Sequence, residues 1–293
     1  MDLTALNQIL QEVDKILPPQ PALKLTVSKE ATGLFDSKLG GVPYFPKDMA
    51  YPTGKANDFN GKPLVLLVQL NFEQLPPVPD FPHKGILQIF IAPDDLYGMS
   101  PDYGDGMTRQ DNFRVVYHET ILTDESQLLS AADLPDYTQD EDDYLPFTGT
   151  YKLIHQQPEK LYADWYDHRF NDAFVTAYNQ LHDDTIEDMW DVSELFEETD
   201  DDDEDVTASL LGQRNGDLEA FIGGYPVFTQ DDPRCDNSIA DCDTVLFELD
   251  SVYDRDSGID IMWGDMGTGS FLIPRDRLKA LDFSRVVYNY DCG

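Results

Sequence analysis

The sequence is poor in basic residues. Its 293 residues include 20 lysines and arginines against 57 aspartates and glutamates, which gives a formal net charge of −37 at pH 7. A surface this negative repels phosphate backbones and anionic lipid headgroups. The shortage of positive charge therefore argues against nucleic-acid and membrane-surface binding, whereas a basic protein, a small molecule or a divalent cation stays compatible with it.

Residues that carry nucleophilic or metal chemistry are also scarce. Three cysteines (Cys235, Cys242 and Cys292) are too few and odd in number for a disulfide framework, which predicts reduced thiols and a cytoplasmic protein. The five histidines form no His-x₃-His pair, and no Gly-x-Ser-x-Gly or Cys–His signature occurs. We therefore expect no cofactor and no metal site, and the sequence leaves open whether the protein is an enzyme.

Long apolar runs are missing as well. No stretch of ~18 consecutive apolar residues occurs, so we expect no transmembrane helix. The first residues lack the basic region of a signal peptide, in keeping with a cytoplasmic location.

The sequence does contain segments whose apolar residues have the spacing typical of helices, and others whose composition is typical of strands. Apolar residues from Leu3 to Leu17 recur with helical spacing, and the prolines from Pro18 onward end that helix. Residues 158–198 have a helical pattern, and a short helix fits Arg275–Leu281. The predicted strands, rich in branched and aromatic residues, are Leu64–Leu70, Gly85–Ala92, Phe113–Ile121, Val245–Leu249, Ile259–Trp263, Ser270–Ile273 and Arg285–Tyr290.

Two segments are strongly acidic. The stretch 123–150 reads as a loop around Asp140–Asp143, and Glu197–Asp205 is acidic at every position except Thr199. Like charges at this density repel one another, so we expect the second run to be solvated and mobile.

Four blocks of sequence occur twice in the same order. Gly40–Phe45 corresponds to Gly223–Phe228, and both contain Gly-Gly-x-Pro. The other pairs are Leu67–Asn71 with Leu246–Asp250, Ile89–Ile91 with Phe271–Ile273, and the identical Arg-Val-Val-Tyr at 114–117 and 285–288. Each half contains too few strands to bury a core alone, so the two halves should share one.

These patterns predict an α+β fold. We expect a single compact domain over residues 1–293, with two mainly antiparallel β-rich halves at about 36–122 and 219–292. The halves would be related by internal duplication and a pseudo-two-fold axis. An N-terminal helix precedes them, and residues 123–218 form an acidic, largely helical insertion between them.

The second half suggests a ligand site. Gln69 and Glu248 are polar at matching mid-strand positions, either because they face solvent or because they line a cleft between the halves. Asp250 follows Glu248 on the same strand face, and Trp263 with Asp265 flanks a glycine turn. We expect a small ligand or ion to bind near the pseudo-axis among these residues.

Two loops offer alternative sites. Gln230, Asp232 and Arg234 place a carboxylate and a guanidinium in one loop, which is either an ion-paired turn or a ligand-binding loop. The sequence DSVYDRDSGID at 250–260 has the acidic spacing of a calcium loop, but it lacks the glycine and distal glutamate of an EF-hand, and a turn between strands explains it equally.

The combined motif order resembles the YwqG-like family, a widespread group of bacterial proteins with a domain of unknown function. The resemblance covers roughly residues 30–292, and its motifs are Ser37–Tyr44 with Pro46, Leu67–Leu70, Gly85–Gln88, Gly223–Pro226, Thr229–Arg234, Leu249–Ser251, Trp263–Asp265 with Gly267, and Asp291-Cys292. It implies a bacterial cytosolic protein of mixed α and β structure. It implies no activity, so it assigns no role to any residue.

For function, the sequence favours a cytosolic, non-enzymatic module that binds a protein or small ligand, one version being an acidic antidote to a basic partner. The alternatives are a hydrolase that uses carboxylates in the cleft between the halves, and a calcium-binding protein.

Overall fold

The structure is a computed structural model that describes residues 3–134, 144–163, 165–195 and 214–293. The acidic runs at Asp140–Asp143 and Glu197–Asp205 lie outside the described residues. Among the described residues, regular structure is mainly antiparallel β, organised as one eleven-stranded sheet and a two-stranded hairpin. Within the described part, no helix combines the length and the apolar character that crossing a bilayer requires.

The sheet runs in the order β13-β12-β9-β8-β1-β6-β2-β3-β4-β5, and β7 pairs beside β6 on β1. Its strands are β1 (Gln20–Ser28), β2 (Lys38–Gly40), β3 (Val65–Asn71), β4 (Ile86–Ile91), β5 (Phe113–His118), β6 (Thr150–His155), β7 (Glu159–Leu161), β8 (Ala220–Gly223), β9 (Thr244–Asp250), β12 (Thr268–Ile273) and β13 (Val287–Asp291). The separate hairpin consists of β10 (Val252–Asp254) and β11 (Ile259–Ile261). All pairings in the sheet are antiparallel.

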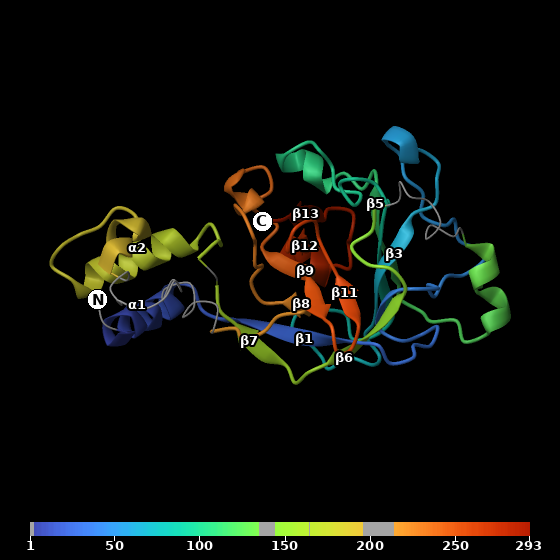
Figure 1. Cartoon of the computed structure of the whole chain (residues 1–293), viewed down its shortest axis with the longest axis horizontal. Helices are drawn as coiled ribbons and strands as arrows, with labels where there is room; N and C mark the ends of the chain where they lie inside the picture. Colours follow the sequence, from blue (N-terminus) through green and yellow to red (C-terminus); the bar gives the residue numbers. More distant parts are fainter. Residues whose placement is uncertain (1–2, 135–143, 164, 196–213) are drawn as a thin grey trace.

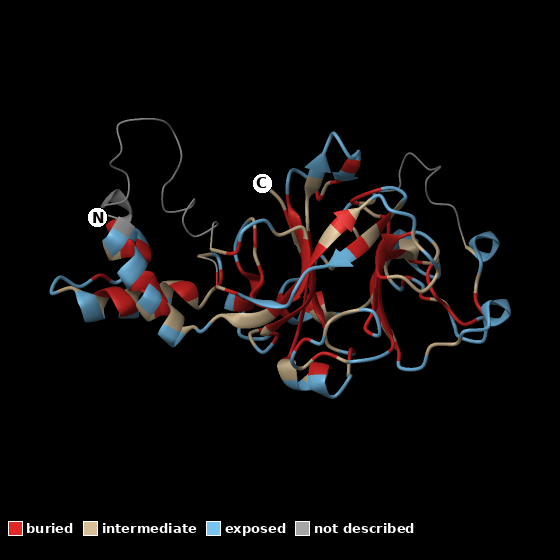
Figure 2. Ribbon diagram, turned by 90° about the horizontal axis from the view of Figure 1, so that it is seen from below, coloured by how far each residue is buried: buried red, intermediate tan, exposed pale blue. Residues whose placement is uncertain are grey.

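The sheet curls into a half-barrel around one central core (Figure 1). Its two outer ends approach each other. The ring of Phe113 on β5 lies 5.4 Å from the ring of Tyr288 on β13 and 6.0 Å from the ring of Phe271 on β12. Tyr117 similarly contacts Phe283 at 5.4 Å. The shared core that the sequence predicted is therefore present, and Figure 2 shows the buried strands that enclose it.

Long loops reach from both halves of the sheet to its central strands. After β3, residues 79–81 of the loop 72–85 lie beside the ends of β1 and β8, and Asp80 forms an ion pair with Arg275 at 3.0 Å. After β9, the segment 251–267 reaches β6, where Tyr151 Oη donates to Asp260 O at 3.2 Å. Each loop thus contacts strands that are distant from it in the sheet order.

The helices lie largely apart from the sheet. In Figure 1, α1 (Leu3–Ile16) and α2 (Phe170–Leu181) pack side by side at one end of the molecule, whereas α4 (Arg275–Lys279) follows β12. The first two share their own small core, which includes Ile9 and Phe174. Their exposed and buried residues alternate in stripes in Figure 2, as expected for amphipathic helices.

The predicted insertion needs correction. We expected residues 123–218 to be largely helical, but β6 and β7 lie within that range, and β6 pairs with both β1 and β2 at the middle of the sheet. β1 was also missing from the predicted strands. These strands were hard to recognise because prolines precede β1 and because Lys152 and His155 interrupt the apolar pattern of β6. The N-terminal helix and the helix at Arg275 are confirmed.

Candidate functional site

Gln69 is a buried structural residue of β3. Its side-chain oxygen accepts hydrogen bonds from Tyr44 N at 2.8 Å and from Gln88 Nε2 at 2.9 Å, and its Nε2 donates to two loop carbonyl oxygens. Gln88 Oε1 lies 3.0 Å from the ring nitrogen Nε2 of His118, whose pKa burial lowers to about 4. The network therefore holds the loop after Gly40-Gly41 against the sheet and stays uncharged at neutral pH.

Glu248 occupies a similar position on β9. Its Oε1 accepts from Val227 N at 2.9 Å, and its Oε2 accepts from Ser270 Oγ at 3.0 Å. Burial raises its pKa well above the usual range, and the charges of Asp250 and Asp291 add to the effect. Burial also raises the pKa of Asp250 to about 6. The structure therefore gathers Glu248, Asp250 and Asp291 into a row of carboxyl groups beneath the loop that follows Gly223-Gly224.

The structure does not bring Gln69 and Glu248 together across a cleft. Their neighbours Val68 and Phe247 belong to the central core. Because side chains alternate along a strand, Gln69 and Glu248 lie on the opposite, outer face of the sheet, each under its own loop. They are 0% and 1% exposed, so they do not face solvent either. Both sequence-based explanations are corrected: each side chain anchors a loop.

Trp263 and Asp265 are also separated. Trp263 is fully buried in the central core, where its ring lies 5.3 Å from that of Tyr97 and 5.8 Å from that of Tyr290. Its ring lies over Gly269, where a Cβ atom would come within 2.5 Å of it. Asp265 is exposed, and its backbone oxygen accepts from Gly293 N. One of these residues thus packs the core while the other lies on the surface.

Asp232 and Arg234 form the centre of a buried ionic network. Arg234 is 1% exposed and its Nη2 donates to Asp232 Oδ2 at 2.6 Å and to Asp167 Oδ2 at 2.9 Å. Asp167 also pairs with Arg169 at 2.6 Å, and His168 Nδ1 lies 2.9 Å from Asp232 Oδ2. The network ties the loop 230–236 of the sheet to the segment that leads into α2. Gln230 stays outside it and donates through Nε2 to Cys292 O.

Charge in this network is balanced. Burial alone would raise the pKa of Asp232, but hydrogen bonds from His168 and Arg234 and the charge of Arg234 outweigh it and hold the pKa well below its usual range. Asp167, His168 and Asp232 bring possible ligand atoms within 4.8 Å of one another. However, Arg169 already bonds to Asp167, and Arg234 bonds to both carboxylates. The arrangement is therefore that of a structural ion-pair network.

A cleft of about 460 Å³ opens beside this network. Asp232 and Pro233 form part of its wall, together with the carboxylates of Asp231 and Asp236. Four aromatic side chains and Cys235 complete the lining; the aromatic residues are Tyr103, Trp165, Tyr166 and Trp190. The cleft thus lies between three parts of the chain: the loop between β4 and β5, the loop between β8 and β9, and the segments that flank α2.

Several aromatic rings of the cleft are open to solvent. Tyr103 is 74% exposed and Trp190 is 56% exposed. The ring of Trp165 lies 5.3 Å from that of Tyr166 and 5.6 Å from that of Trp190. Aromatic faces beside carboxylates are the environment that proteins use to bind cations.

The sequence prediction found one wall of this cleft and missed the rest. Asp232 was among the predicted residues, but the aromatic residues and Asp167 were not. Trp165, Tyr166 and Asp167 lie in the sequence ADWYDHRF at 163–170, where two aromatic residues and three charged or titratable residues follow one another. That unusual density was the available signal. The DSVYDRDSGID segment forms the β10–β11 hairpin, as its interpretation as a turn between strands predicted.

Comparison with known proteins gives a family but no activity. Residues 37–292 match the family model described as Domain of unknown function (DUF1963). No curated protein matches the chain. The matched region begins just before β2 and includes β13, and it contains both the carboxyl row and the aromatic cleft. Since it spans most of the sequence, the chain belongs to the DUF1963 family.

Proposed function

We propose that the protein is a non-enzymatic binding module of the cytoplasm whose aromatic cleft takes a cationic side chain of a basic partner protein. The observation that carries the proposal is the cleft itself, where exposed aromatic rings lie beside Asp231 and Asp236. A lysine or arginine side chain placed there would meet ring faces and carboxylates together. Such cation–π contacts contribute about 0.5–2 kcal/mol each, more when desolvated.

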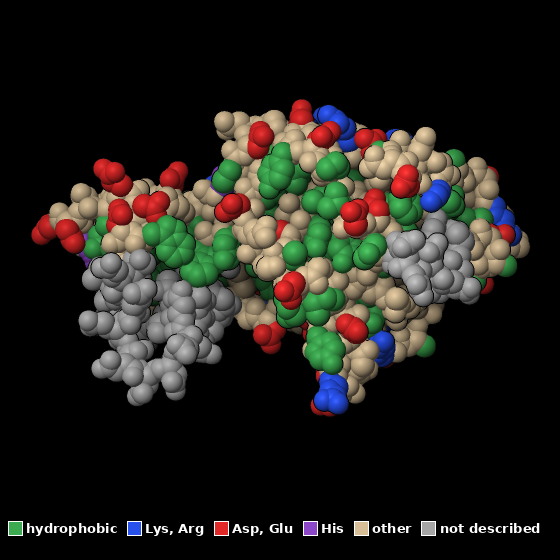
Figure 3. Space-filling model, turned by 45° about the horizontal axis from the view of Figure 1, so that its top comes forward, with side chains coloured by type: hydrophobic (Ala, Val, Ile, Leu, Met, Phe, Trp, Pro, Cys, Tyr) green, Lys and Arg blue, Asp and Glu red, His purple; other side chains and the backbone are tan. Residues whose placement is uncertain are grey.

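The charge of the whole protein supports the same partner class. With a net charge of −37, the chain attracts basic proteins and repels acidic ones over distances of about 10 Å at ordinary salt. Figure 3 shows acidic side chains spread over one face with hydrophobic side chains between them and few basic ones. The cleft would then supply the local contacts, and the general charge would accelerate association.

The wall of the cleft at Asp232 is held in place by other side chains, which also supports binding rather than catalysis. Asp232 is held by Arg234 and His168, so the carboxylate is oriented before any ligand arrives. Partial desolvation, together with the charges of Asp232 and Asp231, raises the pKa of the exposed Cys235, which keeps its thiol protonated and weakly nucleophilic at neutral pH. A rigid, aromatic and acidic wall suits recognition of a cation.

The test uses a synthetic peptide that alternates lysine or arginine with glycine, and a glutamate–glycine peptide of equal length. Two of the three tryptophans line the cleft and Trp263 is buried, so tryptophan fluorescence reports on cleft occupancy. We expect saturable binding of the basic peptide alone. Trp190→Ala should weaken it several-fold, about 1 kcal/mol, because one aromatic face is lost.

Tyr253→Ala is the matched control, because Tyr253 is a 63% exposed aromatic residue on β10 outside the cleft. It should bind the basic peptide as the wild type does. Equal binding by the Trp190→Ala and wild-type proteins, or binding of the acidic peptide, would contradict the proposal. Affinity capture with the wild type and with Trp190→Ala would then identify natural partners that depend on the cleft.

We also propose that the two halves arose by duplication and that the chain is YwqG-like within its family. In support, the ladders β3–β4 and β9–β12 both contain an irregularity at the matching residues Leu67 and Leu246. The amides of Tyr44 and Val227, each just after the repeated Gly-Gly-x-Pro, donate to the matching Gln69 and Glu248. The Arg-Val-Val-Tyr blocks match less well, since they are displaced by two residues in their ladders.

A hydrolase is a second hypothesis, and the raised pKa of Asp250 favours it, because a value of about 6 suits acid–base catalysis. Neither Asp250 nor Glu248 lines the aromatic cleft. A panel of ester, amide and glycoside substrates, assayed with the wild type and Asp250→Asn, tests this hypothesis. A calcium titration by calorimetry tests the calcium-binding hypothesis, with Asp254→Asn as the variant.

A further inference from the structure

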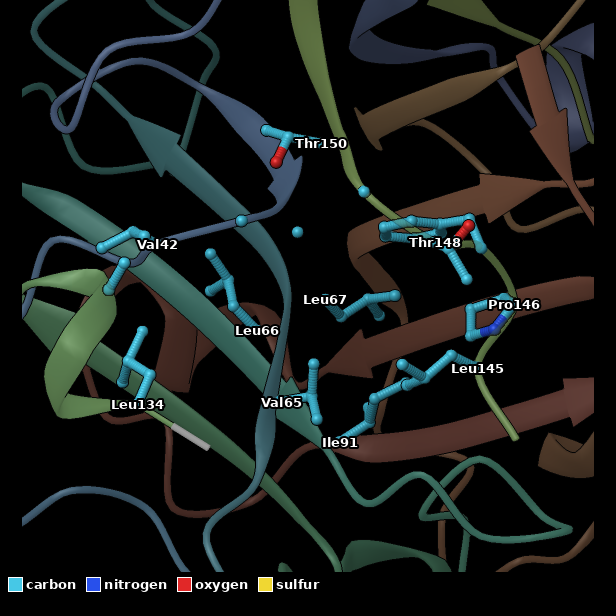
Figure 4. Close-up of a pocket in the computed structure, with 15 residues that line it drawn as sticks. Val42, Val65, Leu66, Leu67, Ile91, Leu134, Leu145, Pro146, Thr148 and Thr150 are labelled. Carbon is cyan, nitrogen blue, oxygen red and sulfur yellow. The ribbon is translucent and has the colours of Figure 1, made fainter. Parts of the chain in front are cut away.

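A second cavity lies where the sheet opens between β2 and β3. β2 pairs with β3 only at Lys38–Gln69 and Leu39–Val68, after which Gly40 and Gly41 turn the chain away with φ values of +63° and +68°. The first residues of β3 therefore continue without a neighbour from β2. Across from them runs the segment 145–150 that leads into β6. The space between them is a cavity of about 410 Å³ (Figure 4).

The lining of this cavity is apolar and uncharged. Val65, Leu66 and Leu67 of β3 line one side, and Leu145 and Pro146 line another, with their side chains around a common space in Figure 4. Among the described residues that line it, none carries a charge, although the chain has 57 acidic residues. The hydroxyl groups of Thr148 and Thr150 are the only side-chain polar groups in this described lining.

The corresponding place beside β8 is filled by protein. Gly223 and Gly224 also have positive φ values and also end a strand, but the cavity next to them measures only about 20 Å³. There the loop 79–81 and Arg275 occupy the space. Protein interiors are close-packed, so an open apolar space of ligand size beside one glycine pair contrasts with the filled one.

We propose that the cavity between β2 and β3 binds an uncharged, mainly apolar small molecule, such as an aromatic ring system or a short acyl chain with a neutral polar end. Its volume falls within the range of about 300–1,000 Å³ that is usual for small-molecule sites. Among the described lining residues, an anion would find no positive side chain, and the protein's charge would repel it. A cation would lose its hydration without gaining a carboxylate from these residues.

The test uses N-phenyl-1-naphthylamine, an uncharged apolar dye whose fluorescence rises on leaving water. We expect saturable binding at one site per chain, with displacement by decanol but not by decanoate or decylammonium. Val65→Phe should fill the cavity and weaken dye binding about tenfold or more. Val252→Phe is the matched control, because Val252 is also a half-buried strand valine but lies outside the lining; it should bind the dye normally.

Four results would overturn the proposal. The first three are absence of saturable dye binding, wild-type affinity in Val65→Phe, and displacement by decanoate as effective as that by decanol. If circular dichroism shows that Val65→Phe does not fold, Thr148→Trp at the exposed rim replaces it with the same expected loss. A variant with residues 135–143 replaced by glycine and serine completes the test. Dye binding by this variant alone would mean that the chain itself occupies the cavity, which also overturns the proposal.

Discussion

Replacing Arg234 with methionine should destabilise the protein severely. The substitution removes the guanidinium that bonds to Asp232 at 2.6 and 2.9 Å and to Asp167 at 2.9 Å, all of it in the interior. Methionine fills much of the volume, so the main cost is electrostatic: two buried carboxylates lose a shared positive charge. Removing one partner of a buried ion pair typically costs about 3–5 kcal/mol.

The expected loss of stability in Arg234→Met depends on the partners that Asp167 and Asp232 keep. Arg169 still pairs with Asp167, and His168 still lies beside Asp232, so the carboxylates are not wholly unpartnered. We therefore expect about 3 kcal/mol, a large share of the 5–15 kcal/mol that is usual for folded proteins. Arg277→Met is the control, since Arg277 and Asp282 form an exposed pair at 2.6 Å, for which at most about 1 kcal/mol is expected.

The pH dependence distinguishes lost charge pairing from lost packing. In the wild type the pKa of Asp232 is depressed, so this residue contributes stability above its unfolded-state pKa, and that stability is lost as pH falls through the folded-state pKa. Without Arg234 its pKa rises, and lowering the pH protonates the carboxylate and relieves the penalty. The difference between Arg234→Met and the wild type should thus be smaller at pH 5 than at pH 7.

The assay is urea denaturation at both pH values, followed by tryptophan fluorescence and circular dichroism. A loss below about 1 kcal/mol, or one equal to that of Arg277→Met, would refute the reasoning. A loss that is the same at both pH values would show that packing, and not charge, dominates.

Two further stability measurements follow from the structure. Because the pKa of Asp250 is raised to about 6, its folded form binds a proton more tightly than the unfolded chain; stability should therefore fall by at most about 3 kcal/mol as pH rises from 4 to 6. Asp250→Asn should flatten part of this pH profile in urea denaturation, whereas a profile unchanged from the wild type would be inconsistent with the raised pKa of Asp250. Gly40→Ala should lower the melting temperature far more than Gly61→Ala, since both have positive φ but only at Gly40 would a Cβ lie 2.4 Å from a carbonyl oxygen; equal losses would rule this out.

Local patterns predicted most elements but not the centre of the sheet. The strands around Leu67, Phe90 and Phe247 were recognisable because fully buried strands are continuous apolar runs. β6 was missed because it is short and because Lys152 and His155 interrupt its apolar pattern. Its place between β1 and β2 depends on pairing with distant residues. No local periodicity encodes such a pairing.

For the candidate sites too, the sequence indicated some of the residues but not the contacts that they make. Gln69 and Glu248 were identified from the sequence as unusual, because buried strands seldom carry polar residues. Both side chains are indeed buried in the structure. Their use as loop anchors became visible only with their hydrogen bonds to Tyr44 and Val227. The dense aromatic segment at 163–170 was a local signal for the cleft, but its complete lining was not predictable, because Tyr103, Trp190 and Asp231 come from segments far apart in the sequence.

The acidic character, the β-rich composition, the N-terminal helix and the two positions where paired glycines turn the chain can all be read from the sequence alone. These follow from residue types and short-range sterics, which act within a few residues. Long-range packing accounts for three further features: the sheet curls around one core, Arg234 is buried between Asp167 and Asp232, and the space beside one glycine pair is open while the space beside the other is filled. Those outcomes depend on which distant segments share the limited interior space, and packing, not local preference, decides that.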